Sequence, residues 1–94
     1  MVPRADQRFA RSGEVVSRVL DGEAILLDLG TGRYLGLNDV ATRVWELLEE
    51  GRTFGAIREA LLAEFEVTPD VLDGDLDRLF ADMLSRGIIR ASAP

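Results

Sequence analysis

Carboxylates are the side chains whose number and spacing first suggest chemistry. Five of them crowd the stretch from residue 70 to residue 82: Asp70, Asp73, Asp75, Asp77 and Asp82. Asp73 and Asp77 would share one face of a helix, as paired acids or ligands of a divalent ion would. The surrounding residues form no calcium-loop pattern, however, and no histidine is present to complete a transition-metal site. We therefore interpret the cluster as a solvated acidic face.

The chain contains no histidine and no cysteine. These absences remove the commonest general base, the commonest transition-metal ligand, thiol nucleophiles and disulfides. Gly30-Thr31-Gly32 continues into neither of the glycine-rich phosphate-binding motifs, so we interpret it as a turn. The residues therefore predict a protein that is not an enzyme and needs no cofactor, compatible with a reducing cytoplasm.

Charge and hydropathy narrow the classes of partner. Eleven arginines, with no lysine, stand against 17 acidic residues, giving a formal net charge of −6 that disfavours nucleic acid. No apolar stretch is longer than Ala24–Leu27, far short of the ~20 residues that span a bilayer. Residues 1–13 contain no continuous apolar segment of a secretory signal. We expect a soluble, cytoplasmic protein without membrane contacts.

Three strands are predicted in the first part of the chain, over residues 15–20, 23–29 and 33–37. Asp21-Gly22 is typical of a two-residue hairpin turn, and Gly30-Thr31-Gly32 forms the second turn. The middle run has apolar residues on both faces, which favours a central strand. A meander leaves the third strand at a sheet edge, with free outer N–H and C=O groups.

Three helices follow, each with a capping residue. Asn38 caps a helix that closes at Gly51, Thr53 caps a second, and Thr68 followed by Pro69 opens a third that runs to about Arg86. Trp45 lies beside the apolar stripe of the first helix, so we interpret it as core. The predicted fold is α+β: a three-stranded antiparallel sheet followed by a three-helix bundle. Residues 14–90 form the single domain, between a loose arm (1–13) and a frayed end (91–94).

The exposed third strand is the candidate functional feature. An extended peptide can add to a sheet edge as a further strand, with main-chain bonds giving affinity and side-chain pockets giving specificity. Asp75, Leu79, Asp82 and Arg86 would form a strip along the third helix that can wall such a groove. On the residues alone, an ordinary exposed edge explains the pattern equally well. A proline at Leu35 is expected to reduce peptide binding more than stability.

Residues 22–89 resemble the PqqD-like family, the precursor-recognition domains of ribosomally made, modified peptides. The resemblance rests on "AILLDLGTGRYLGLN", then "VATRVWELLEEGRTFGAIREALLAEFEV", then "DLDRLFADMLSRGII". It implies that a leader peptide docks as a fourth strand against the third strand and the third helix. The residues that it implies are Arg33, Tyr34, Leu35, Gly36 and Leu37 from the strand, and Asp75, Leu76, Leu79, Asp82 and Met83 from the helix.

Within the family, the sequence is most similar to the stand-alone proteins of lasso-peptide pathways, which deliver the leader to a separate protease and a cyclase. The alternative is the namesake partner of a radical SAM enzyme in pyrroloquinoline quinone synthesis. Glu49-Glu50-Gly51 replaces the Cys or Asp-Gly motif usual there before the second helix.

Two further classes remain as alternatives. The order of strands and helices is also that of winged-helix DNA-binding regulators, but the acidic third helix would repel phosphates. A homodimer that pairs through the same sheet edge is compatible with peptide binding.

Overall fold

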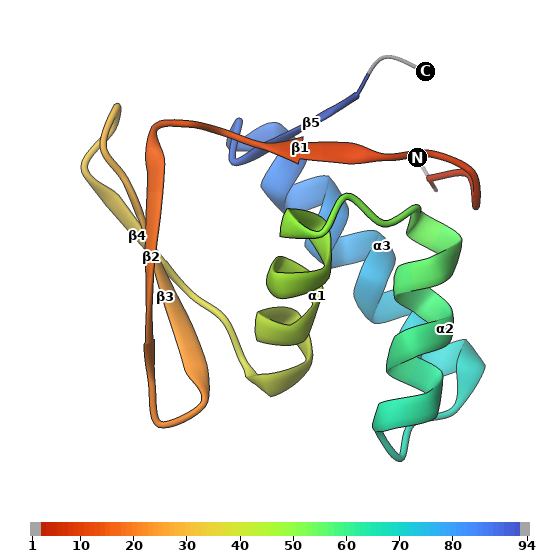
Figure 1. Cartoon of the computed structure of the whole chain (residues 1–94). Coiled ribbons are helices and arrows are strands. Elements are labelled where there is room, and N and C mark those ends of the chain that lie inside the picture. The colour runs from red at the N-terminus through yellow and green to blue at the C-terminus, as the bar shows by residue number, and fades with distance from the viewer. Residues whose placement is uncertain (1–2, 93–94) are drawn as a thin grey trace.

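The computed structural model describes residues 3–92 of the chain. Figure 1 shows a three-stranded sheet at one end, three helices beside it and a short strand pair across the top. The three-stranded sheet and the three helices of the predicted α+β fold are confirmed. No described helix is long and apolar enough to cross a membrane.

The larger sheet is an antiparallel meander of β2 (Val15–Leu20), β3 (Glu23–Asp28) and β4 (Arg33–Gly36), with β3 in the centre. Asp21 and Gly22 both have positive φ angles, 52° and 80°, as a tight hairpin turn between right-twisted strands requires. β2 and β4 each pair only with β3, so both are edge strands.

Only one face of this sheet is buried. Ala24 and Leu26 of β3 face the core, whereas their neighbour Ile25 is exposed on the opposite face. Val16, Leu20 and Tyr34 also leave large apolar surface exposed there. The apolar residues on both sides of β3 thus mark a central strand with one open face.

The helices begin where the caps predict. They are α1 (Asp39–Glu49), α2 (Phe54–Glu64) and α3 (Pro69–Ser85), and the side chains of Asn38, Thr53 and Thr68 each accept a first-turn backbone N–H. Gly51 and Gly87 follow α1 and α3 with φ angles of 76° and 70°, the left-handed conformation that ends helices without a Cβ penalty.

The expected loose arm is wrong for residues 9–11, and residues 1 and 2 of that arm lie outside the described residues. Phe9–Arg11 forms β1, which pairs with β5 (Ile89–Ala91), so segments near both ends of the described chain join the folded unit. Phe9 is buried, with its ring centroid 5.1 Å from that of Phe80. The boundaries expected at residues 13/14 and 90/91 are corrected accordingly, and residues 93 and 94 of the expected frayed end lie outside the described residues.

Trp45 is buried in the core, as predicted. The Arg11 guanidinium lies 3.9 Å from the centre of the Trp45 ring, and its Nη1 is 3.0 Å from a carboxylate oxygen of Glu49. A residue of the supposed arm therefore covers α1 by a cation–π contact.

Candidate functional site

The outer edge of β4 carries hydrogen-bonding groups that pair with no other strand. Leu37 N–H donates to Ala24 C=O at 2.8 Å, and the register therefore directs the main-chain groups of Leu35 and Arg33 toward β3 as well. By the same alternation the N–H and C=O groups of Tyr34 and Gly36 point away from the sheet. Within the described residues, no backbone bond between elements reaches these two. This edge can accept a further strand.

A buried hydroxyl fixes the end of β4. Thr42 of α1 is buried, and its Oγ1 accepts the Ala24 N–H at 2.8 Å and donates to Leu37 C=O at 3.4 Å. The hydroxyl thus replaces one bond of the β3–β4 ladder and ties the strand end to the helix. Thr42 was not among the predicted residues, because a threonine within a helical pattern does not indicate which strand its hydroxyl will contact.

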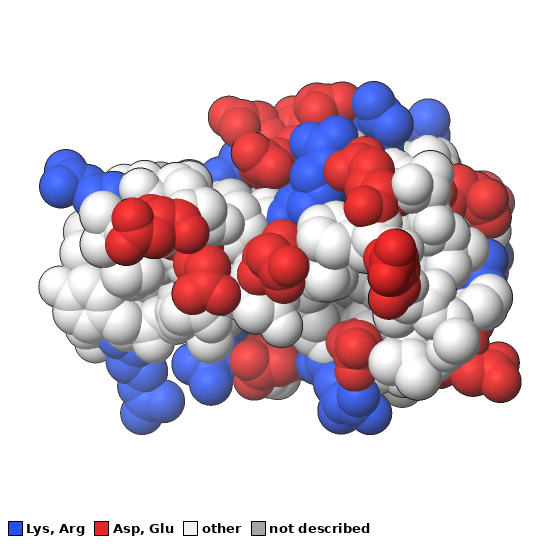
Figure 2. Space-filling model, turned by 90° about the horizontal axis from the view of Figure 1, so that it is seen from below, with Lys and Arg blue, Asp and Glu red and all other residues white. Residues whose placement is uncertain are grey.

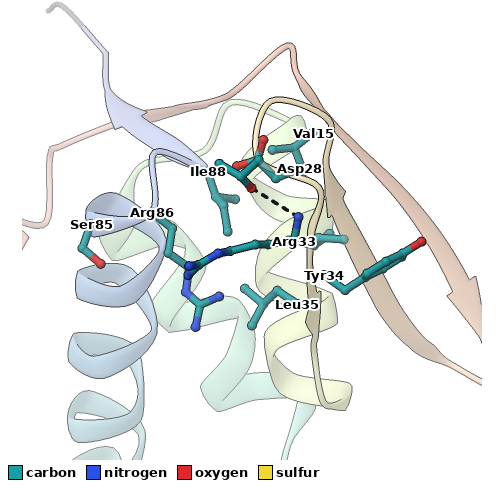
Figure 3. Close-up of a pocket in the computed structure, with 10 residues that line it drawn as sticks. Val15, Asp28, Arg33, Tyr34, Leu35, Ser85, Arg86 and Ile88 are labelled. Carbon is teal, nitrogen blue, oxygen red and sulfur yellow. Dashed lines mark hydrogen bonds between the residues drawn. The ribbon is translucent and has the colours of Figure 1, made fainter.

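A groove of about 510 Å³ lies between β4 and the C-terminal end of α3. Its apolar lining comes from Val15, Leu26 and Leu35 of the sheet and from Ile88 after α3. Leu26 and Ile88 are buried, and Leu35 is half-buried. Figure 3 shows Leu35 directed into the space beside the helix and Tyr34 directed away from it. A peptide added to β4 would place alternate side chains over this apolar floor.

The rim of the groove is polar. Arg33 and Asp28 from the sheet, and Ser85 and Arg86 from the end of α3, line it together with Thr31 of the turn. Arg86 Nε donates to Asp82 Oδ1 at 3.0 Å, one helical turn back. The site therefore combines an unpaired strand edge, an apolar floor and a charged rim with two arginines.

The structure separates the ten predicted site residues into different environments. Tyr34 and Gly36 present the free edge, and Arg33 and Leu35 line the groove. Asp75 is exposed and ion-paired to Arg78, while Leu79 and Asp82 are half-buried on the strip that ends at Arg86. None of these three helical residues lines the groove itself.

Three of the ten lie in the core and away from the groove, contrary to the expectation. Leu37 is 5% exposed, Leu76 and Met83 are each 1% exposed, and none of the three lines the groove. The family resemblance implied these residues by their places on the third strand and the third helix. Leu76 and Met83, however, lie on the inner stripe of α3, which faces α2 and the small sheet.

Seven groove residues were missing from the predicted set: Val15, Leu26, Asp28, Thr31, Ser85, Arg86 and Ile88. Arg86 was nevertheless foreseeable, because it is the last residue of the helical strip predicted to wall the groove (Asp75, Leu79, Asp82 and Arg86). Val15 and Leu26 line the groove because their side chains lie on the same inner face of the sheet as that of Leu35.

Two ion pairs with lowered carboxyl pKa values join neighbouring helices. Arg58 Nε is 2.6 Å from Asp73 Oδ1, and this hydrogen bond lowers the pKa of the Asp73 carboxyl below its usual value. The hydrogen bond from Arg43 to Glu64, at 2.8 Å, lowers the pKa of Glu64 in the same way. Within residues 3–92 no group of three or more potential ligands could hold a metal ion. The acidic cluster is thus partly used in structural ion pairs.

Comparison with known protein families now decides the assignment. The family model for coenzyme PQQ synthesis protein D (PqqD) matches residues 23–89. The chain belongs to the PqqD family. This match spans β3 to the start of β5 and leaves out β1 and β2. The resemblance seen in the sequence is thereby confirmed.

Two solved structures are similar to this PqqD-family chain. One is described as TbiB1 in complex with the TbiA(beta) leader peptide; it is 35% identical with a TM-score of 0.80, over 90% of this chain and 99% of that one. The other is described as lasso peptide synthetase B1 complexed with the leader peptide; it is 26% identical with a TM-score of 0.72, over 88% and 98% of the two chains. No curated protein matches the chain.

Proposed function

We propose that this PqqD-family protein is a non-catalytic peptide-binding protein that takes up the leader segment of a ribosomally synthesised precursor. The observation that carries the proposal is the free outer edge of β4 beside an apolar groove. The two similar structures support it, because both are described as complexes with a leader peptide. Both are similar to this chain over nearly their whole length.

The leader adds to β4 as a fourth strand. The main-chain groups of Tyr34 and Gly36 form the new ladder, while Arg33, Leu35 and Arg86 meet the leader side chains that point into the groove. Leu79, Asp82 and Asp75 continue the wall along α3 and contact only a leader that extends past the groove.

Presentation to other enzymes is the second half of the proposal. The partners are a leader protease and a cyclase of a lasso-peptide pathway, since one of the similar structures is described as a lasso peptide synthetase component. The alternative partner is a radical SAM enzyme of the pyrroloquinoline quinone type, which the family name itself favours. Binding takes place in the cytoplasm, where ribosomes make the precursor.

Calorimetric titration tests the binding step directly. The protein is titrated with a synthetic peptide that covers the leader of the precursor encoded beside this gene, and separately with the core segment of the same precursor. We expect the leader to bind with a Kd below about 10 μM, or roughly −7 kcal/mol, and the core not to bind. Absence of leader binding at tens of micromolar would refute the proposal.

The two alternatives make different predictions. Figure 2 shows that, on the face in view, arginines are interspersed with carboxylates instead of forming a basic strip, which disfavours nucleic acid. A gel shift with nearby promoter DNA at low salt should therefore show no complex. A homodimer through the β4 edge would compete with the leader, so light scattering should report a lower mass once leader is added.

A further inference from the structure

Two arginines face each other across the groove. Arg33 extends from β4 toward α3, and Arg86 extends from the end of α3 into the same space (Figure 3). Both are exposed and both line the cavity. Arg86 is paired with Asp82, and the Asp28 carboxylate also lines the cavity, so the charges there are partly balanced. The N–H groups that the two guanidinium groups leave free can still hold an anion between them.

Neither guanidinium is fully used within the protein. Arg33 lies directly opposite Asp28 in the β3–β4 register, yet no described ion pair or side-chain hydrogen bond joins them. The Asp28 carboxylate instead accepts the Gly30 N–H of the turn at 2.9 Å. Arg86 donates only Nε to Asp82, so its two terminal nitrogens make no hydrogen bond to a described residue. Planar donor groups of this kind match a carboxylate, which accepts two bonds from one fork.

We propose that Arg33 and Arg86 together bind one carboxylate side chain, Asp or Glu, of the peptide that adds to β4. The inference rests on the proposed function, because it names the chemistry that the groove selects in its leader. The protein carries a net charge of −6, so an acidic peptide is repelled elsewhere on the surface. A leader with one carboxylate placed between the two arginines is therefore favoured over a strongly acidic one.

Such a contact would fix the register in which the peptide pairs with β4. The free edge of β4 offers a uniform main-chain ladder, and a shift of one residue would turn every groove-facing side chain of the peptide to the outer face. The apolar floor formed by Leu26 and Leu35 tolerates many apolar side chains, so it restrains the register weakly. A carboxylate held between the two arginines fixes which leader residues lie over the floor.

A double-mutant cycle tests the contact. The probe is the fluorescein-labelled leader of the precursor encoded beside this gene, made unaltered and with each Asp or Glu changed singly to Asn or Gln. Anisotropy titrations use the wild-type protein, Arg33→Gln, Arg86→Gln and the control Arg18→Gln. Arg18 is a matched control, since it is exposed on the other edge strand and no ion pair joins it to a described residue.

We expect one leader position at which loss of the carboxylate weakens binding about tenfold to wild-type protein and to Arg18→Gln, but less than about twofold to Arg33→Gln and Arg86→Gln. Arg33→Lys should recover only part of the loss, because an ammonium lacks the fork. This variant also keeps the test valid if Arg33→Gln does not fold, which circular dichroism would reveal.

Two results would overturn the carboxylate site while leaving the proposed function intact. One is a leader that binds wild-type protein although it contains no acidic residue. The other is a set of carboxylate losses that weaken binding equally to all the proteins. If the unaltered leader does not bind the wild-type protein at all, the proposed function falls, and the carboxylate site falls with it.

Discussion

The two edge strands of the sheet differ in what lies beside them. β2 and β4 both pair only with β3, and both leave one row of main-chain groups free. Beside β4 the end of α3 forms a second wall, and the space between them is a groove with an apolar floor. β2 contributes only its first residue, Val15, to that groove. The hollow along the rest of β2 is lined only by residues of the three strands and lies on the open face of the sheet. A free edge becomes a specific binding site only where a second element supplies side-chain pockets.

The two strands also expose different residues along their free edges. Leu29 N–H donates to Glu14 C=O, so the main-chain groups of Ser17 point outward from β2. Tyr34 has the same position on β4. A pair of substitutions at these two positions can therefore separate the effect of an edge from the effect of the groove.

The largest expected effect on stability distinguishes the main-chain groups of β4 that face β3 from those that face outward. Leu35→Pro removes the N–H that faces β3 and leaves the buried Leu26 carbonyl without its donor, at a cost of about 3 kcal/mol. Tyr34→Pro removes only an outward N–H, so it should cost less than about 1 kcal/mol. Urea unfolding of both variants measures the difference. We therefore expect Leu35→Pro mainly to destabilise the fold, and not mainly to reduce peptide binding as the sequence suggested. Equal losses of unfolding free energy in Leu35→Pro and Tyr34→Pro would show that the assigned alternation of inward and outward main-chain groups is wrong.

Thr42→Val should give the next largest effect, because among residues 3–92 the buried hydroxyl of Thr42 lies at the end of β4 and none lies at the end of β2. The substitution keeps the shape but leaves the Ala24 N–H without its acceptor, so we expect a loss of about 2 kcal/mol. Thr42→Ser keeps the hydroxyl and is the control. Thermal unfolding of the two variants provides the measurement, and similar melting temperatures would contradict the role given to the hydroxyl.

Leader affinity should then distinguish the edge formed by β4 from the edge formed by β2. Tyr34→Pro removes a donor from the proposed leader ladder and places a ring at the edge, so leader affinity should fall at least about tenfold, or roughly 1.4 kcal/mol. Ser17→Pro makes the same change on β2 and should leave affinity within about twofold. Calorimetry with the leader peptide compares them. Equal losses would mean that the leader does not use β4 in particular.

The smallest effect concerns neither edge but the ion pair between α2 and α3. Arg58 lowers the pKa of Asp73 in the folded protein. The ion pair therefore stabilises the fold at pH values above the pKa that Asp73 has in the unfolded chain. This stabilisation is lost as the pH falls through the lower pKa that Asp73 has in the folded protein. Because Asp73 is about half exposed, the effect should be small. Urea midpoints between about pH 6 and pH 2 should decline less steeply for Asp73→Asn than for wild type. An unchanged slope would show that this pair contributes nothing to acid unfolding.

Much of the fold was predictable because its signals are local. The Asp21-Gly22 turn, the caps Asn38, Thr53 and Thr68, and the apolar spacing of the helices each act within a few residues, and the structure confirms them. The pairing of Phe9–Arg11 with Ile89–Ala91 was missed, since three-residue strands carry no periodic pattern and each depends on a partner at the other end of the chain.

The residues alone indicated that β4 would be an edge strand, that no histidine or cysteine chemistry was available, and that the chain resembled the PqqD family. The side chains that reach the groove became known only from the packing of the folded chain. Leu76 and Met83 lie on the inner stripe of α3 and are buried, while Arg86 at the helix end reaches the cavity with Arg33. The physical reason is that helical periodicity shows which residues share a face, but the packing of the whole chain determines what that face meets.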